Sequence, residues 1–240
     1  MPGRCVGKHV VVTGASSGIG RALSRAWGRE GATVWMGARS EKALEEAARE
    51  VDRAGGHGHA LPLDVTQRDS IQRFGQAVAA QAPGVDVLVN NAGVGHWGAM
   101  DATDAATWDR VIATNLTGPF LVTKAMLPLL RKRAGPRHVV NLVSVAGKQA
   151  HAGGSTYSAS KFGLKGWTEA IAAELAEEGI RVVAVCPGYV NTDLVAGSGA
   201  EAERMIQPDD LAQVILDWTF LPASVAVDEI TVWPWEMYTE

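Results

Sequence analysis

Short runs rich in valine recur along the chain and alternate with stretches whose apolar residues follow helical spacing, and this alternation restricts the possible folds most strongly. Strands that read as nearly continuous apolar runs are buried on both faces, as in parallel sheets covered by helices. Alternating strand and helix signals are typical of an α/β fold. The pattern therefore predicts a doubly wound Rossmann fold, with a mostly parallel seven-stranded sheet and helices on both faces.

The expected elements cover almost all of the 240 residues, which indicates a single domain, residues 1–240. We expect strands at residues 9–13, 33–36, 59–63, 85–89, 138–143, 181–186 and 226–232. We expect helices at residues 19–30, 41–54, 68–81, 105–132, 155–178 and 209–218, with residues 105–132 interrupted near Gly118-Pro119 and Pro128. Residues 195–207 break the alternation and form either a loop beside the substrate or a plain surface connection.

Charge and cysteine content argue against several classes of protein. The net charge is −4, and the one basic cluster, Arg131-Lys132-Arg133, ends an expected helix, where cations suit the helix dipole. Cys5 and Cys186 have neither metal-ligand spacing nor a disulfide framework. No stretch has the length of a membrane span or the features of a secretory signal. We expect a cytoplasmic protein with no metal, no nucleic-acid partner and no membrane partner.

A glycine-rich turn, Thr13-Gly-Ala-Ser-Ser-Gly-Ile-Gly20, follows the first expected strand and opens the first expected helix. Glycine lets the backbone approach a pyrophosphate closely, and a helix N-terminus supplies N–H donors. The spacing differs from G-x-G-x-x-G, and the alternative is a glycine-rich turn that only packs the helix against the strand. Its placement favours a dinucleotide site made by Gly14, Ser16, Ser17, Gly18, Ile19 and Gly20.

The end of the second expected strand distinguishes between the two nicotinamide cofactors. An acidic residue there binds a ribose 2′-OH, whereas a basic residue accommodates a 2′-phosphate. The sequence is Gly37-Ala-Arg-Ser40, with no acid, and Arg39 offers a guanidinium for phosphate. Ser40 either adds a hydroxyl or only caps the next helix. We therefore expect NADP(H), with NAD(H) less favoured.

Two further segments lie where parallel strands end. Asp64-Val65 follows the third expected strand, and the carboxylate either accepts the adenine amino group or caps the following helix. Asn91, Ala92 and Gly93 close the fourth strand, at the edge where open parallel sheets bind ligands. The alternative for these three residues is ordinary turn chemistry.

Tyr157 and Lys161 are four residues apart in an expected helix, so their side chains share one face. A free tyrosine ionises near pH ~10, and a nearby ammonium lowers that pKa by favouring the phenolate. Such a pair suits proton exchange with a carbonyl or alcohol oxygen. The alternative is an ordinary surface pair, because Y-x-x-x-K alone is common.

In their order and spacing, these pieces resemble the short-chain dehydrogenase/reductase family from about residue 9 to residue 193. The resemblance also includes Asn115, Ser144 and Pro187-Gly188 through Thr192. It implies that Tyr157 is the acid/base and that Lys161 lowers its pKa and binds the nicotinamide ribose. It further implies that Ser144 binds the substrate oxygen, that Asn115 holds a water linked to Lys161, and that Pro187, Gly188, Val190 and Thr192 contact the nicotinamide end.

The resemblance implies an NADP(H)-dependent oxidoreductase that interconverts a small-molecule carbonyl and alcohol, and a homodimer or homotetramer built through the two long helices. One alternative is a 3-oxoacyl-[acyl-carrier-protein] reductase, which needs a basic surface beside the cleft. Another is a non-catalytic NADP(H)-binding sensor or scaffold, which would be expected to lose the catalytic residues.

Several aromatic and histidine side chains have weaker interpretations. His96, Trp97 and His151 lie in loops near the expected cleft and either shape the pocket or are simply solvated. Trp233 and Trp235, near the C-terminus, are expected to pack on the domain or on a neighbouring subunit.

Overall fold

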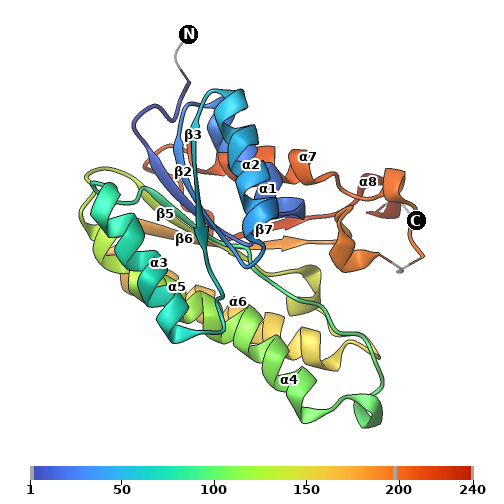
Figure 1. Ribbon diagram of the computed structural model, residues 1–240. Coiled ribbons are helices and arrows are strands. Elements are labelled where there is room, and N and C mark those ends of the chain that lie inside the picture. The colour runs from blue at the N-terminus through green and yellow to red at the C-terminus, as the bar shows by residue number, and fades with distance from the viewer. Residues whose placement is uncertain (1–2, 197–198, 239–240) are drawn as a thin grey trace.

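The computed structural model describes residues 3–196 and 199–238, and seven parallel strands form its central sheet in the order β3-β2-β1-β4-β5-β6-β7 (Figure 1). The strands are β1 (His9–Thr13), β2 (Thr33–Ala38), β3 (His57–Pro62), β4 (Val87–Asn90), β5 (Arg137–Leu142), β6 (Ile180–Pro187) and β7 (Glu229–Val232). The predicted doubly wound Rossmann fold is confirmed, and every strand pair is parallel.

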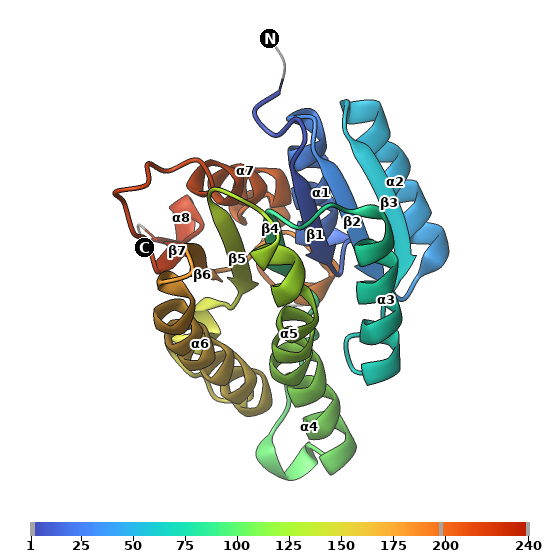
Figure 2. The same ribbon diagram turned by 90° about the vertical axis from the view of Figure 1, so that its left-hand side faces the viewer.

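Helices cover both faces of the sheet. On one face lie α1 (Gly18–Arg29), α2 (Glu41–Ala54) and α7 (Pro208–Trp218). On the other lie α3 (Arg68–Gln81), α5 (Gly118–Arg131) and α6 (Ser155–Ala176), which Figure 2 shows side by side, largely below the strands. Two helices lie outside these layers: α4 (Ala105–Ile112), which precedes α5, and the short α8 (Trp235–Tyr238). None of the described helices is both long and apolar enough to cross a membrane.

Strand β1 shows why the valine runs are continuous. Val10 and Val12 belong to the core beneath α1, α2 and α7, whereas Val11 belongs to the core beneath α3, α5 and α6. Successive strand side chains point to opposite faces, so a strand covered on both sides needs apolar residues at every position. All three valines are fully buried, each contributing about 1.5–3 kcal/mol through burial.

A polar network is buried where β4 and β5 face α5 and α6. Asn90 Nδ2 donates to Asn141 Oδ1 at 2.8 Å and to Thr123 Oγ1 at 2.9 Å. Asn141 Nδ2 in turn donates to Thr168 Oγ1 at 2.9 Å. Because buried amides are costly to leave unpaired, these bonds fix the position of both helices relative to the strand ends.

The irregularity in residues 105–132 lies slightly earlier than predicted. A π-helical turn, Ala113–Thr117, separates α4 from α5, and Pro119 occupies the first turn of α5. Proline is tolerated there because the first turn needs no intrahelical N–H donor. Pro128 lies inside α5 without ending it, so the expected second interruption is wrong.

The last segment also differs in detail from the prediction. Strand β7 begins at Glu229 rather than at residue 226, since its pairing with β6 begins there. In the stretch 195–207, two short 3₁₀ turns are described, Asp193–Val195 at its start and Ala202–Arg204 within it. Residues 197–198 lie outside the described residues.

Candidate active site

A cavity of about 1060 Å³ opens along the carboxyl ends of the strands. This is where open parallel sheets bind ligands, at the point where the strand order reverses between β1 and β4. Among the residues predicted for the cofactor and for catalysis, only Gly20 and Asn115 do not line the cavity. The predicted residues that line it are Gly14, Ser16, Ser17, Gly18, Ile19, Arg39, Ser40, Asp64, Val65, Asn91, Ala92, Gly93, Ser144, Tyr157, Lys161, Pro187, Gly188, Val190 and Thr192.

The glycine-rich turn leaves no room for side chains. Gly14 has φ of 66°, in the left-handed region, and a Cβ there would lie 2.9 Å from the Ala92 Cα. A Cβ on Gly20 would lie 2.3 Å from the Gly14 carbonyl oxygen. Helix α1 begins at Gly18, so its free N–H groups meet the cavity. A bare backbone at a helix N-terminus fits a dinucleotide pyrophosphate.

Asn91 joins the end of β4 to this turn. Its Nδ2 donates to the Thr13 carbonyl at 2.9 Å and to the Gly14 carbonyl at 3.2 Å. Thr13 Oγ1 accepts from the backbone N–H groups of Asn91 and Ala92, each at 3.0 Å. The Asn91 side chain therefore acts as a cross-link that shapes the cavity floor.

The structure shows whether the side chains of Ser40 and Asp64 cap the helices that follow them. Ser40 occupies the N-cap position of α2, but its side chain makes no capping hydrogen bond, so its hydroxyl is not committed to the helix. Asp64 Oδ1 accepts from the Thr66 N–H at 2.9 Å and from the Thr66 hydroxyl at 2.7 Å. The N-cap of α3 is Gln67, so Asp64 closes a turn rather than capping the helix. Arg39 lies exposed beside Ser40 on the cavity wall.

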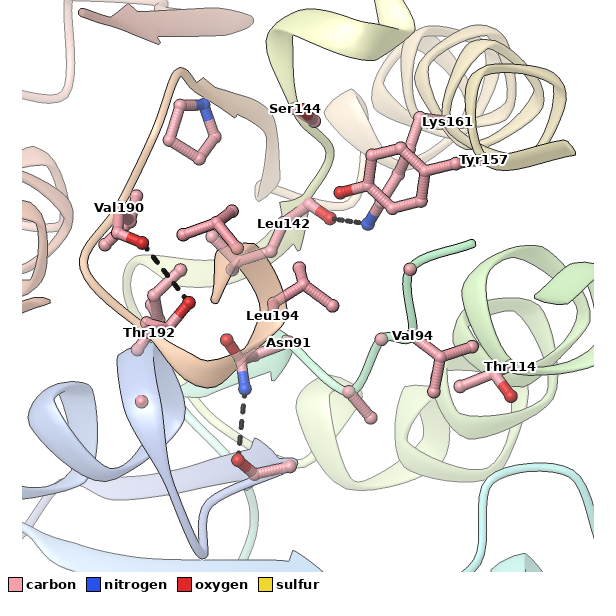
Figure 3. A pocket seen from close by; sticks show the side chains of 18 of the residues that line it. Asn91, Val94, Thr114, Leu142, Ser144, Tyr157, Lys161, Val190, Thr192 and Leu194 are labelled. Carbon is pink, nitrogen blue, oxygen red and sulfur yellow. Dashed lines mark hydrogen bonds between the residues drawn. The ribbon is translucent and has the colours of Figure 1, made fainter. Parts of the chain in front are cut away.

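Tyr157 and Lys161 project from α6 into the cavity, one helical turn apart (Figure 3). Both are buried, with exposed fractions of 8% and 4%. The Lys161 ammonium donates to the Leu142 carbonyl at 2.7 Å and lies 5.6 Å from the centre of the Tyr157 ring. Ser144 follows β5, and its Oγ accepts from the Ala146 N–H at 3.1 Å. The structure therefore brings the three predicted side chains together around one space.

Burial moves both pKa values away from their usual range. Burial raises the pKa of Tyr157 to about 12, and a hydrogen bond with Ser144 opposes the rise. Burial lowers the pKa of Lys161 to about 8. Loss of hydration is the largest cause of the Tyr157 pKa in the chain by itself, and the effect of Lys161 on the phenol stays a prediction. At neutral pH, Tyr157 is a protonated phenol.

Asn115 lies in the π-helical turn and is fully buried. Its Oδ1 accepts from the Val94 N–H at 2.9 Å, and its Nδ2 donates to the Val94 carbonyl at 2.9 Å and to Ser160 Oγ at 3.1 Å. Ser160 Oγ donates to the Tyr157 carbonyl at 2.7 Å. Asn115 thus connects the segment after β4 with the helix that carries Tyr157.

Sequence reasoning missed several residues that complete the site. Leu142 supplies only a backbone carbonyl, and Ser160 acts through Asn115, so neither carries a side-chain motif. Other residues, among them Thr114, Arg110, Tyr189 and Leu194, line the cavity without a periodic signal.

The histidine and tryptophan side chains expected near the cleft differ in where the structure places them. Trp97 and His151 line the cavity, whereas His96 Nε2 is hydrogen-bonded to Thr103 Oγ1 at 3.0 Å. Trp233 lines the cavity but is 45% exposed, and Trp235 is 77% exposed. Trp233 therefore packs only partly on the domain and Trp235 hardly at all, and packing on a neighbouring subunit stays a prediction.

Comparison with known proteins points to one family. The profile of the short chain dehydrogenase family matches residues 8–203. The chain is 37% identical to the 3-oxoacyl-[acyl-carrier-protein] reductase of Thermotoga maritima, a similarity that covers 89% of this chain and 90% of that protein. It is 42% identical to a putative ketoacyl reductase of Streptomyces coelicolor, over 78% of this chain and 72% of the other.

Solved structures agree with this comparison. A metagenomic short-chain oxidoreductase in complex with NADP has a TM-score of 0.84 and 38% identity, covering 95% of this chain and 97% of that chain. An alcohol dehydrogenase from Thermococcus sibiricus complexed with 5-hydroxy-NADP has a TM-score of 0.86 and 30% identity, covering 93% and 95%.

Proposed function

The chain belongs to the short-chain dehydrogenase/reductase family, and on that premise we propose that it is an NADP(H)-dependent oxidoreductase interconverting a carbonyl and an alcohol, with Tyr157 as acid/base. The observation that carries the proposal is the convergence of Tyr157, Lys161 and Ser144 on a cavity that also contains a bare glycine turn at a helix N-terminus. A dinucleotide placed along that turn has its reactive end within reach of a proton donor.

The side chains have separate roles in this reaction. Tyr157, protonated at neutral pH, gives its proton to the carbonyl oxygen during reduction. The Ser144 hydroxyl holds the same oxygen, and Lys161 binds the nicotinamide ribose. When bound, the reduced nicotinamide supplies the hydride that the carbonyl carbon accepts. Both Nδ2 hydrogens of Asn115 are donated to Val94 and Ser160, so its side chain has no N–H left for a water.

Preference for NADP(H) over NAD(H) rests on the end of β2. Arg39 offers a guanidinium and Ser40 an uncommitted hydroxyl, and no acidic residue stands there to repel a 2′-phosphate. Relatives with structures in complex with NADP and 5-hydroxy-NADP support the same preference.

We expect Arg39→Leu to lower kcat/KM for NADPH by about 10- to 100-fold, the range for losing hydrogen bonds to a charged group. Activity with NADH should change by less than about threefold, since NADH has no 2′-phosphate. The measurement is initial-rate kinetics with both cofactors on a panel of ketones and aldehydes. Arg49→Leu is the matched control, because Arg49 lies exposed on α2 and pairs with Glu45. A parent enzyme that prefers NADH would contradict the cofactor assignment.

A second candidate is favoured by one comparison. The similarity to a 3-oxoacyl-[acyl-carrier-protein] reductase suggests a 3-oxoacyl thioester substrate. Reduction of acetoacetyl thioesters more efficiently than any simple ketone would favour it. NADPH binding without oxidation across the whole panel would instead indicate a non-catalytic sensor or scaffold.

Assembly and compartment complete the proposal. We propose a homodimer or homotetramer formed through α5 and α6, where Phe120 and Phe162 are each 45% exposed. Both cysteines are free and buried, which fits a cytoplasmic, reducing compartment.

A further inference from the structure

The indole of Trp97 lies beside the proposed proton donor. Its ring centre is 5.5 Å from that of Tyr157, with the two planes inclined by 36°. Trp97 lines the cavity, and 56% of its surface is exposed. A large part of this ring is therefore free to contact whatever group is attached to the reacting carbon.

The Trp97 ring is held in place by its own segment. A Cβ on Gly95 would lie 2.1 Å from Cζ3 of the indole, so the ring rests directly on the Gly95 backbone. The Gly98 N–H donates to the Gly153 carbonyl at 2.8 Å, which fastens the segment to the turn before α6. The indole surface is thus largely preorganised, which reduces the entropy lost when a ligand binds against it.

The chain's C-terminal part adds a second apolar wall. Trp233 lines the cavity, and a Cβ on Gly188 would lie 3.4 Å from its Cε3 atom. Leu194, 37% exposed, faces the same cavity (Figure 3). Lys148 also lines the cavity, but its ammonium is bound to the Glu229 carboxylate and the Thr231 hydroxyl. Lys148 therefore offers no free ammonium to an anionic substituent, while Trp233 and Leu194 offer apolar surface.

We propose that the substrate is an aryl ketone or the corresponding aryl carbinol, whose aromatic ring packs against the indole of Trp97. The inference rests on the proposed function, since it places the carbonyl oxygen at the Tyr157 hydroxyl. A substituent bonded directly to the carbonyl carbon then lies beside the Tyr157 hydroxyl and close to the Trp97 ring. A planar ring at that position can stack on the exposed indole face, which a puckered or flexible alkyl group matches less well.

The test compares acetophenone with cyclohexyl methyl ketone, which has the same number of heavy atoms but no π system. We expect Trp97→Leu to lower kcat/KM for acetophenone about 3- to 10-fold more than for cyclohexyl methyl ketone, the range for one aromatic pair. Comparing parent with variant cancels the difference in intrinsic reactivity between the two ketones. Trp97→Phe should keep most of the aryl preference. Trp235→Leu is the matched control, because Trp235 does not line the cavity, and it should leave the ratio unchanged.

Calorimetry of the NADPH-saturated protein gives a readout that does not depend on turnover. We expect 1-phenylethanol to bind more tightly than 1-cyclohexylethanol, and Trp97→Leu to remove the difference. The inference would be overturned if Trp97→Leu lowered kcat/KM equally for both ketones, or if the parent bound both alcohols with equal affinity. Either result would leave the proposed function standing. Failure of every carbonyl to oxidise NADPH would overturn the proposed function. The substrate assignment would then fall with the function, and calorimetry would decide only whether Trp97 forms an aryl-binding site, which absence of 1-phenylethanol binding would overturn.

Discussion

Tyr157→Phe is expected to lower kcat by about 10²- to 10⁴-fold, the usual contribution of one general acid or base. The variant keeps the aromatic ring and its contact with Trp97 but removes the only atom of the side chain that exchanges a proton. Because the pKa of about 12 leaves the phenol protonated at neutral pH, the loss should be clearest for carbonyl reduction. The measurement is the steady-state rate of NADPH oxidation with the best ketone of the panel.

Cofactor affinity separates this effect from a damaged fold. NADPH should bind Tyr157→Phe within about threefold of the parent in a fluorescence titration, because the glycine turn and Arg39 are unchanged. Tyr189→Phe provides a matched control, since it removes a hydroxyl from another tyrosine at the cavity. A Tyr157→Phe enzyme with the parent's kcat would rule out the proposed acid/base.

The second prediction concerns how the free energy of unfolding changes at acidic pH. Burial lowers the pKa of His138 from 6.5 to about 4, and the charges of Arg181 and Lys8 act in the same direction. Between about pH 6.5 and pH 4, the His138 imidazole is protonated in the unfolded chain but neutral in the folded chain. The free energy of unfolding therefore falls as the pH drops through this window. We expect His138 alone to remove about 2 kcal/mol of unfolding free energy between about pH 7 and pH 5.

Urea unfolding at both pH values measures this loss. His138→Leu should unfold with a pH dependence weaker by about 2 kcal/mol than that of the parent, whatever its stability at neutral pH. His57→Leu is the matched control, because His57 is exposed on the edge strand β3. An unchanged pH dependence in His138→Leu would show that this imidazole is not the group responsible.

The sheet was predictable because its constraint is local and repeated. Every central strand must be apolar on both faces, so the valine runs reveal it without knowledge of contacts. The carboxyl ends of those strands then bring the glycine turn, Arg39 and Asn91 to one edge, whatever the details of the loops. Nearly all predicted residues therefore line a single cavity.

The features that sequence reasoning missed depend on distant contacts. The π-helical turn Ala113–Thr117 contains no glycine or proline, and Asn115 in it bonds to Val94 and Ser160. The elevated pKa of Tyr157 follows from burial, which spacing alone cannot supply. The Trp97 ring is fixed by a neighbouring glycine and a backbone bond to Gly153, neither of which forms a motif.

The position of Trp233 has a consequence for how such a protein can diversify. The glycine turn lies between β1 and α1, whereas Trp233 follows β7, which pairs with β6, and its ring lies close to Gly188. A chimera that exchanges the stretch 208–238 would therefore replace the Trp233 wall of the cavity and keep the glycine turn. One wall of the substrate space can therefore change with the C-terminal stretch, while Trp97 and the residues around the glycine turn stay as they are.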